Sequence, residues 1–127
     1  MRQSAAPGKA AVTVKRGELY RLRKPGGQDP KASRVYAVVS RQAVIDSRFA
    51  TVICVPVYTA RHGLATQVAV GIDEGLKHDC ALHCDQLVSL PKPRLTDFVG
   101  ALSSEKVREL DRALASALDI DAENLFD

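Results

Sequence analysis

The feature that most limits the possible fold is a pair of β-branched, apolar runs in the first half of the chain. The runs are RVYAVVS over 34–40 and TVICVPV over 51–57, and both have the length of an ordinary strand. Apolar side chains fall on both alternating faces, so each run predicts a central strand buried on both sides or lying in a small barrel. A chain of 127 residues allows one such domain and leaves little room for a second.

Shorter segments complete the expected sheet. Strands are predicted around 18–23, at 66–72 and at 79–88, where apolar residues alternate with polar or small ones. About five strands with short connections, followed by a helix, predict a mainly β protein of the small β-barrel type.

One segment near the C-terminus has a clear helical pattern. Ser103 and Ser104 precede it and are suitable N-cap residues. Apolar residues then recur at helical spacing, namely Val107, Leu110, Leu114, Ala117 and Leu118.

The ends of the chain differ in composition from this core. Residues 1–15 are small and polar without a period, which predicts a flexible basic arm, whereas 16–120 form the domain and 121–127 an acidic tail. Two prolines and two glycines over 24–33 predict a long loop. No apolar run is long enough to cross a bilayer, and three cysteines without a framework spacing suit a reducing compartment, so we expect a cytoplasmic protein without a membrane partner.

Charge is distributed unevenly along the chain. The net charge is +3, but residues 1–34 hold nine Lys and Arg against two acidic residues, and residues 97–127 hold three against eight. A basic first quarter can attract a polyanion such as nucleic acid, or an acidic partner, and it can equally be an ordinary solvated surface.

The stretch HDCALHCDQL, 78–87, carries the densest set of reactive side chains. In a strand, Cys80 and Cys84 share one face and lie roughly 13 Å apart at about 3.3 Å per residue, too far to bind one zinc ion. We therefore predict core cysteines and no metal site. His83 and Asp85 would share the opposite, exposed face, as either a plain polar surface or a ligand contact.

The order of several short motifs resembles the MazF/PemK/Kid toxin family. The motifs are RGELY, RVYAVVS, TVICVPVYTA, CDQL and the closing GALSSEKVRELDRALASALDI, which together span about 16–120. The resemblance implies a small SH3-like β-barrel, of the kind shared with CcdB toxins, that carries a C-terminal helix and forms a homodimer.

The resemblance also implies an activity. Family members are sequence-specific endoribonucleases that need no metal or other cofactor and cut single-stranded RNA, chiefly mRNA and sometimes rRNA or tRNA. They leave 2′,3′-cyclic phosphate and 5′-hydroxyl ends and so arrest growth. An acidic MazE-like antitoxin wraps the toxin and blocks the RNA groove.

Three residues lie at or next to the family's two catalytic positions, and they are the catalytic candidates that the resemblance implies. Arg34 stands where the family has its main catalytic arginine and would clamp the scissile phosphate. The family's catalytic threonine follows the proline of V-P-x-T by two residues, where this chain has Tyr58, with Thr59 one further on. Thr59 would need a bulge to reach the same face, because strand neighbours point to opposite sides.

Candidate RNA contacts follow from the same resemblance. The CDQL match and the loops flanking the groove give five residues, namely Gln28, Arg61, His83, Asp85 and Gln86. A histidine in that place can act as an acid, a base or a phosphate contact.

Two alternatives remain open at this stage. The departures at Tyr58 and at Val35, where the family has proline, allow a catalytically weakened member that acts through antitoxin binding. A CcdB-like gyrase poison would share the barrel and act through C-terminal residues. Arg34→Ala should leave the activity of a gyrase poison unchanged. The same substitution should abolish RNA cleavage by an active ribonuclease.

Overall fold

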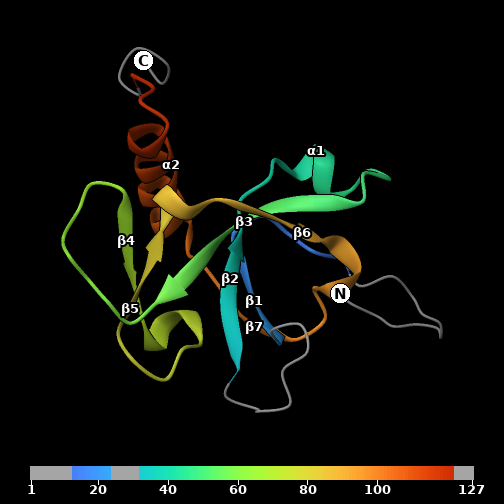
Figure 1. Cartoon of the computed structure of the whole chain (residues 1–127), viewed down its shortest axis with the longest axis horizontal. Helices are drawn as coiled ribbons and strands as arrows, with labels where there is room; N and C mark the ends of the chain where they lie inside the picture. Colours follow the sequence, from blue (N-terminus) through green and yellow to red (C-terminus); the bar gives the residue numbers. More distant parts are fainter. Residues whose placement is uncertain (1–12, 24–31, 122–127) are drawn as a thin grey trace.

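A computed structural model of the protein describes residues 13–23 and 32–121 (Figure 1). The strands are β1 (Glu18–Arg23), β2 (Ser33–Val38), β3 (Thr51–Tyr58), β4 (Gln67–Val70), β5 (Cys80–His83), β6 (Val88–Pro91) and β7 (Phe98–Ala101). The helical elements are α1 (Gln42–Ile45), α2 (Ser104–Ala117) and the 3₁₀ turns η1 (Ile72–Glu74), η2 (Cys84–Gln86) and η3 (Lys92–Arg94). In the described part of the chain, no helix is both long and apolar enough to cross a membrane.

The strands form one curled antiparallel sheet in the order β4-β5-β3-β2-β1-β7. β3 is the longest strand and changes partner along its length: Thr51–Cys54 pairs with β6, and Val57 and Tyr58 pair with β5. Because β6 and β5 lie along different halves of β3, the sheet bends there into half a barrel (Figure 1). The predicted class, a mainly β SH3-like barrel with a C-terminal helix, is confirmed.

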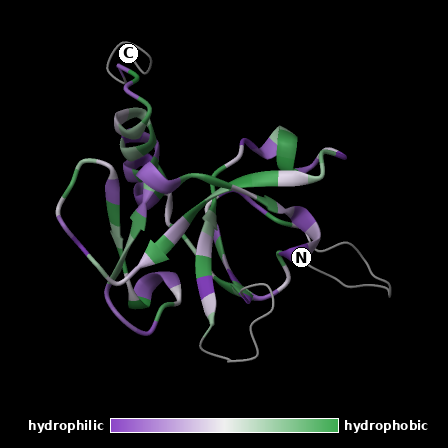
Figure 2. Cartoon of the chain, in the orientation of Figure 1, coloured by the Kyte–Doolittle hydropathy of each residue, from purple (hydrophilic) through white to green (hydrophobic). Residues whose placement is uncertain are grey.

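The central strands are buried on both faces, as their composition predicts. On one face Leu19, Ala37 and Val55 are register neighbours across β1, β2 and β3, and all three are fully buried. Leu110 of α2 belongs to the same cluster. Figure 2 shows hydrophobic residues running along β2 and β3, which is where this core lies.

A second cluster covers the other face of the same strands. It contains Tyr20, Val38 and Cys54 from the sheet, together with Leu95, which follows η3. Val14 packs into this cluster too, so the end of the predicted 1–15 arm belongs to the folded core. The rest of that arm, most of the 24–33 loop and most of the 121–127 tail lie outside the described residues.

Helix α2 begins where the serines predict. The Ser103 side chain accepts a hydrogen bond from the Lys106 backbone N–H at 3.1 Å, which caps the helix. The helix ends at Ala117, and Leu118, the last residue of the predicted apolar pattern, is its C-cap residue and is 54% exposed.

The predicted strand at 79–88 is interrupted. β5 ends at His83, the turn η2 follows, and β6 begins at Val88. β6 and β7 were not predicted, because four-residue strands containing Pro91 or Gly100 carry little local signal.

Two glycines allow η1 to lie against β7, and this contact gives a testable prediction. A Cβ atom on Gly100 would sit 2.0 Å from the Glu74 carbonyl oxygen, and one on Gly75 would sit 2.2 Å from the Val99 carbonyl oxygen. We expect Gly100→Ala to lower the free energy of unfolding by about 2 kcal/mol or more, measured by urea denaturation.

Gly63→Ala is the matched control. Gly63 has a positive φ of 66°, but a Cβ atom placed on it would have no other atom within 4 Å, so only backbone strain is added. Equal losses in the two variants would contradict the close approach of η1 and β7.

Candidate functional site

Arg34 and Tyr58 form the centre of the site. Tyr36 pairs with Pro56 in the β2–β3 ladder, so two residues further along Arg34 faces Tyr58 across the strands. The Arg34 guanidinium carbon lies 4.2 Å from the centre of the Tyr58 ring, and Nη1 donates to the Val57 carbonyl at 3.2 Å. Both side chains are half-buried, and the cation–π contact fixes the guanidinium at the surface.

The phenol of Tyr58 joins this pair to the turn after β5. Its hydroxyl donates to Gln86 Oε1 at 3.0 Å. The Tyr58 ring also stands edge-on to the His83 ring, at 4.8 Å between centroids and an interplanar angle of 75°. The structure therefore brings together four of the predicted site residues, namely Arg34, Tyr58, His83 and Gln86.

His83 is buried, which corrects the prediction of an exposed strand face. Its side of β5 is covered by the chain after β3, and Nε2 lies 2.9 Å from the Ala60 carbonyl oxygen. A carbonyl can only accept, so Nε2 carries the proton in this contact. His83 thereby packs against the buried side of the Tyr58 ring and links β5 to the segment after β3.

Asp85 is exposed and lies in η2. Thr66 Oγ1 donates to its Oδ2 at 2.6 Å. The predicted pairing of His83 with Asp85 on one strand face is wrong, because η2 ends the strand alternation between them.

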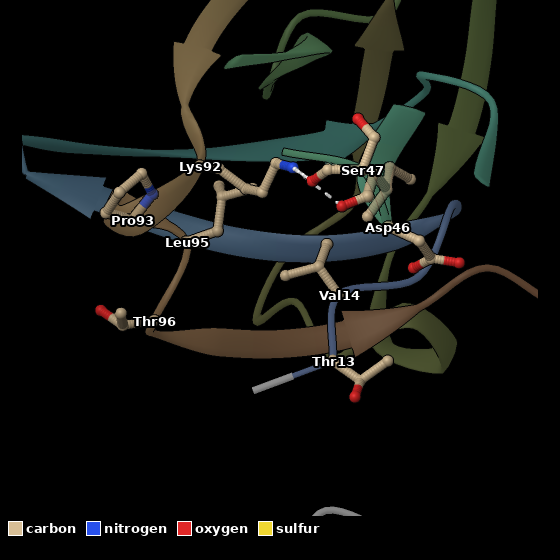
Figure 3. Close-up of a pocket in the computed structure, with 9 residues that line it drawn as sticks. Thr13, Val14, Asp46, Ser47, Lys92, Pro93, Leu95 and Thr96 are labelled. Atoms are coloured by element: carbon tan, nitrogen blue, oxygen red, sulfur yellow. Dashed lines mark hydrogen bonds between the residues drawn. The ribbon is translucent and has the colours of Figure 1, made fainter. Parts of the chain in front are cut away.

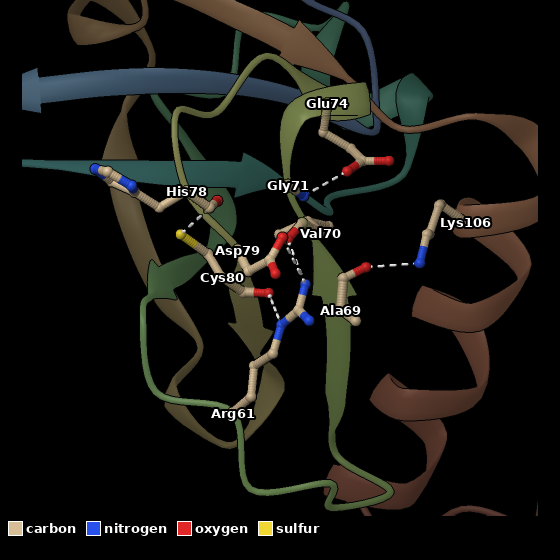
Figure 4. A network of polar contacts seen from close by, with 9 residues as sticks. All are labelled: Arg61, Ala69, Val70, Gly71, Glu74, His78, Asp79, Cys80 and Lys106. Carbon is tan, nitrogen blue, oxygen red and sulfur yellow. Dashed lines mark hydrogen bonds and ion pairs between the residues drawn. The ribbon is translucent and has the colours of Figure 1, made fainter.

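Arg61 points into the far end of the β4–β5 hairpin (Figure 4). Its Nε donates to the Cys80 carbonyl and its Nη2 to the Val70 carbonyl, both at 2.8 Å. Val70 and Cys80 pair at the end of the hairpin opposite to His83. The geometry gives Arg61 a structural role, and an RNA contact by this residue stays a prediction.

The remaining candidates are not placed in the cluster. Thr59 is exposed and follows the last residue of β3, where alternation directs it away from the Tyr58 side. Gln28 lies outside the described residues.

The loop between β3 and β4 holds a neighbour of the cluster, His62, that was not among the predicted site residues. The His62 ring lies 6.4 Å from the His83 ring, at an interplanar angle of 79°. An imidazole four residues after Tyr58 was the available signal, but only the fold of the loop shows that it returns to the cluster.

A hollow of about 520 Å³ lies elsewhere on the molecule (Figure 3). Val14, Ile45 and Leu95 line it, and Lys92 Nζ donates to the Ile45 and Ser47 carbonyls at its edge. None of the predicted site residues that the structure describes lines this hollow, so we place the candidate site at Arg34 and Tyr58.

All three cysteines are free thiols buried in the structure, which confirms the predicted core place of Cys80 and Cys84. Burial raises the pKa of the Cys54 and Cys84 thiols to about 12, and it raises the pKa of Cys80 too. In the described part of the chain, no three His, Cys, Asp or Glu side chains are grouped so as to hold a metal ion.

Comparison with known proteins identifies the class. Residues 15–118 match the family described as PemK-like, MazF-like toxins of type II toxin–antitoxin systems. The chain belongs to this family. It is 30% identical over 115 residues to endoribonuclease MazF6 of Mycobacterium tuberculosis, covering 86% of this chain and 100% of the relative. It is also 28% identical over 89 residues to endoribonuclease MazF3 of that organism, covering 70% and 85%.

Solved structures agree with this membership. An endoribonuclease from a mycobacterial species superposes with a TM-score of 0.70 at 26% identity, covering 86% of this chain and 94% of that one. An endoribonuclease in complex with its cognate antitoxin, also mycobacterial, superposes with a TM-score of 0.69 at 28% identity, covering 82% and 93%. A MazE–MazF complex from Deinococcus radiodurans shares the fold, with a TM-score of 0.69 at 20% identity and coverage of 87% and 100%.

The buried thiols give a testable prediction. With a pKa of about 12, the Cys54 and Cys84 thiols are ionised to about one part in ten thousand at pH 8, and only the thiolate reacts. We expect a chromogenic disulfide reagent to label these cysteines slowly in the native protein and all three rapidly in guanidinium. Rapid labelling of two thiols without unfolding would contradict the burial.

Proposed function

We propose that this toxin is an endoribonuclease that cuts single-stranded RNA without a metal ion. The observation that carries the proposal is the Arg34 guanidinium, held at the surface by the Tyr58 ring, at the position of the family's catalytic arginine. The names of the curated relatives, which are endoribonucleases, support the same activity.

Arg34 suits the role of phosphate clamp. One of its N–H groups donates to the Val57 carbonyl, and within the described residues the others have no hydrogen-bond partner. Guanidinium donors in a planar fork bind two phosphate oxygens at once and stabilise the negative charge that develops when the 2′-hydroxyl attacks phosphorus. The products would be a 2′,3′-cyclic phosphate and a 5′-hydroxyl end.

Tyr58 takes the place of the family's threonine in this proposal. Its ring orients Arg34, and its hydroxyl, now bonded to Gln86, can turn to donate to a phosphate oxygen. His83 keeps the ring in place from its buried side. Thr59 stays a predicted catalytic residue. The predicted RNA contacts stay Gln28, Arg61, His83, Asp85 and Gln86, of which Gln86 is hydrogen-bonded to Tyr58.

The biological setting follows from the same proposal. We place the toxin in the cytoplasm as a homodimer that arrests growth by destroying mRNA, and that a cognate acidic MazE-like antitoxin neutralises. A relative solved with its cognate antitoxin and the basic charge of residues 1–34 support this partner. The relatives and structures named above are endoribonucleases or MazF proteins, which favours this function over a gyrase poison.

Arg34→Ala tests the clamp. We incubate the purified protein with a long unstructured RNA in excess EDTA and map the 5′-hydroxyl ends by sequencing. Wild type should cut at one recurrent short motif, and Arg34→Ala should lose at least about a hundredfold in rate, because the transition-state charge loses its donors. Arg108→Ala, which removes an exposed arginine on α2, is the matched control and should cut normally.

The outcomes separate the alternatives. Equal cutting by Arg34→Ala and wild type contradicts the clamp. An absence of cuts by wild type, with normal antitoxin binding, indicates a weakened member.

Tyr58→Phe and Tyr58→Ala separate the ring from the hydroxyl. Tyr58→Phe keeps the face on which Arg34 stacks but loses the donor, so we expect a fall of about tenfold to a hundredfold in kcat/KM. Tyr58→Ala should fall further, since Arg34 then loses its support. If Tyr58→Phe cuts like wild type, the phenol is not the substitute for the family's threonine.

A further inference from the structure

The row of rings that begins at Arg34 continues into the loop between β3 and β4. Tyr58 lies under the guanidinium at 4.2 Å, His83 is 4.8 Å from Tyr58, and His62 is 6.4 Å from His83. The first three side chains are buried or half-buried, whereas His62 is exposed. The row thus connects the phosphate clamp to a solvent-facing imidazole.

Gln67, the first residue of β4, holds this loop in one shape. Its side-chain Oε1 accepts from the His62 backbone N–H at 2.9 Å, and its backbone N–H donates to the Leu64 carbonyl at 3.0 Å. Gly63 supplies the left-handed turn between them, with φ of 66°. These contacts hold the backbone of His62 and Leu64, on either side of that glycine, in a defined turn.

Neither side chain contributes to a core. Leu64 is 52% exposed, and His62 and Leu64 belong to neither hydrophobic cluster. An aromatic ring and an aliphatic side chain are both exposed on this loop, which the ring contacts of His83 and Tyr58 link to the proposed phosphate clamp. Together they form a surface suited to the flat face of a base.

We propose that His62 and Leu64 form a base-binding subsite, in which the imidazole stacks on a nucleobase neighbouring the phosphate held by Arg34. The inference rests on the proposed ribonuclease function and adds to it a determinant of the cleavage motif. Bases in single strands are unstacked and are recognised by stacking on aromatic rings. The chemistry is stacking, so ring shape matters at this position and positive charge does not.

The test compares three substitutions at one site. His62→Ala should lower kcat/KM on a short RNA carrying the wild-type motif by about five- to a hundredfold, mainly through KM, and relax base preference at one motif position. His62→Phe keeps a ring and should retain most activity. His62→Lys keeps a cation without a ring and should behave like His62→Ala.

His78→Ala is the matched control, because His78 is also exposed but lies in the turn before β5. It should match wild type in rate and motif. Thermal unfolding of all four variants should be unchanged, since both histidines are at the surface.

Binding of an uncleavable oligonucleotide tests the proposed base-binding subsite independently of RNA cleavage. The probe is a 2′-deoxy oligonucleotide that contains the motif, or a pool of 2′-deoxy oligonucleotides of varied sequence. It binds without reacting because it lacks the 2′-hydroxyl that would attack phosphorus. His62→Ala should weaken binding without changing the slope of log affinity against log salt, whereas loss of a phosphate contact lowers that slope by about one.

Three results would overturn the inference: His62→Ala binding like His78→Ala, a lowered salt slope, or His62→Lys active while His62→Phe is not. If wild type does not cut RNA at all, the proposed function fails. The binding comparison then still decides whether His62 stacks on bases.

Discussion

The structure depends on the burial of β1, β2 and β3 on both faces. Leu19, Ala37 and Val55 belong to the core on one face, and Tyr20 and Cys54 belong to the core on the other. A sheet that is buried on both faces needs another element packed against each face. Helix α2 covers one face, and the segment around η3 covers the other. In a domain this small, losing either cover would remove a large share of the buried apolar surface.

The change of pairing partner along β3 positions the candidate site. The first half of the strand pairs with β6 and the last two residues pair with β5, so the strand's end leaves the core and reaches the surface beside β2. Arg34 and Tyr58 meet at that point, half-buried. Rigid, hydrogen-bonded strands on both sides preorganise the guanidinium, which is what electrostatic stabilisation of a transition state needs.

Hydrogen bonds between side chains and the backbone support the candidate site. His83 lies buried with its Nε2 proton on the Ala60 carbonyl, and Gln67 holds the following loop by two hydrogen bonds. Arg61, a predicted RNA contact, ties β4 to β5 by donating to the Val70 and Cys80 carbonyls.

Local patterns were enough to predict the central strands, the closing helix with its Ser103 cap and the core place of Cys80 and Cys84, because hydrophobic period and capping are local properties. The short strands, the burial of His83 and the hydrogen bonds of Arg61 were decided by tertiary structure. Each depends on a group far along the chain, such as the Ala60 carbonyl 23 residues before His83, and no local pattern specifies which carbonyl a side chain will meet.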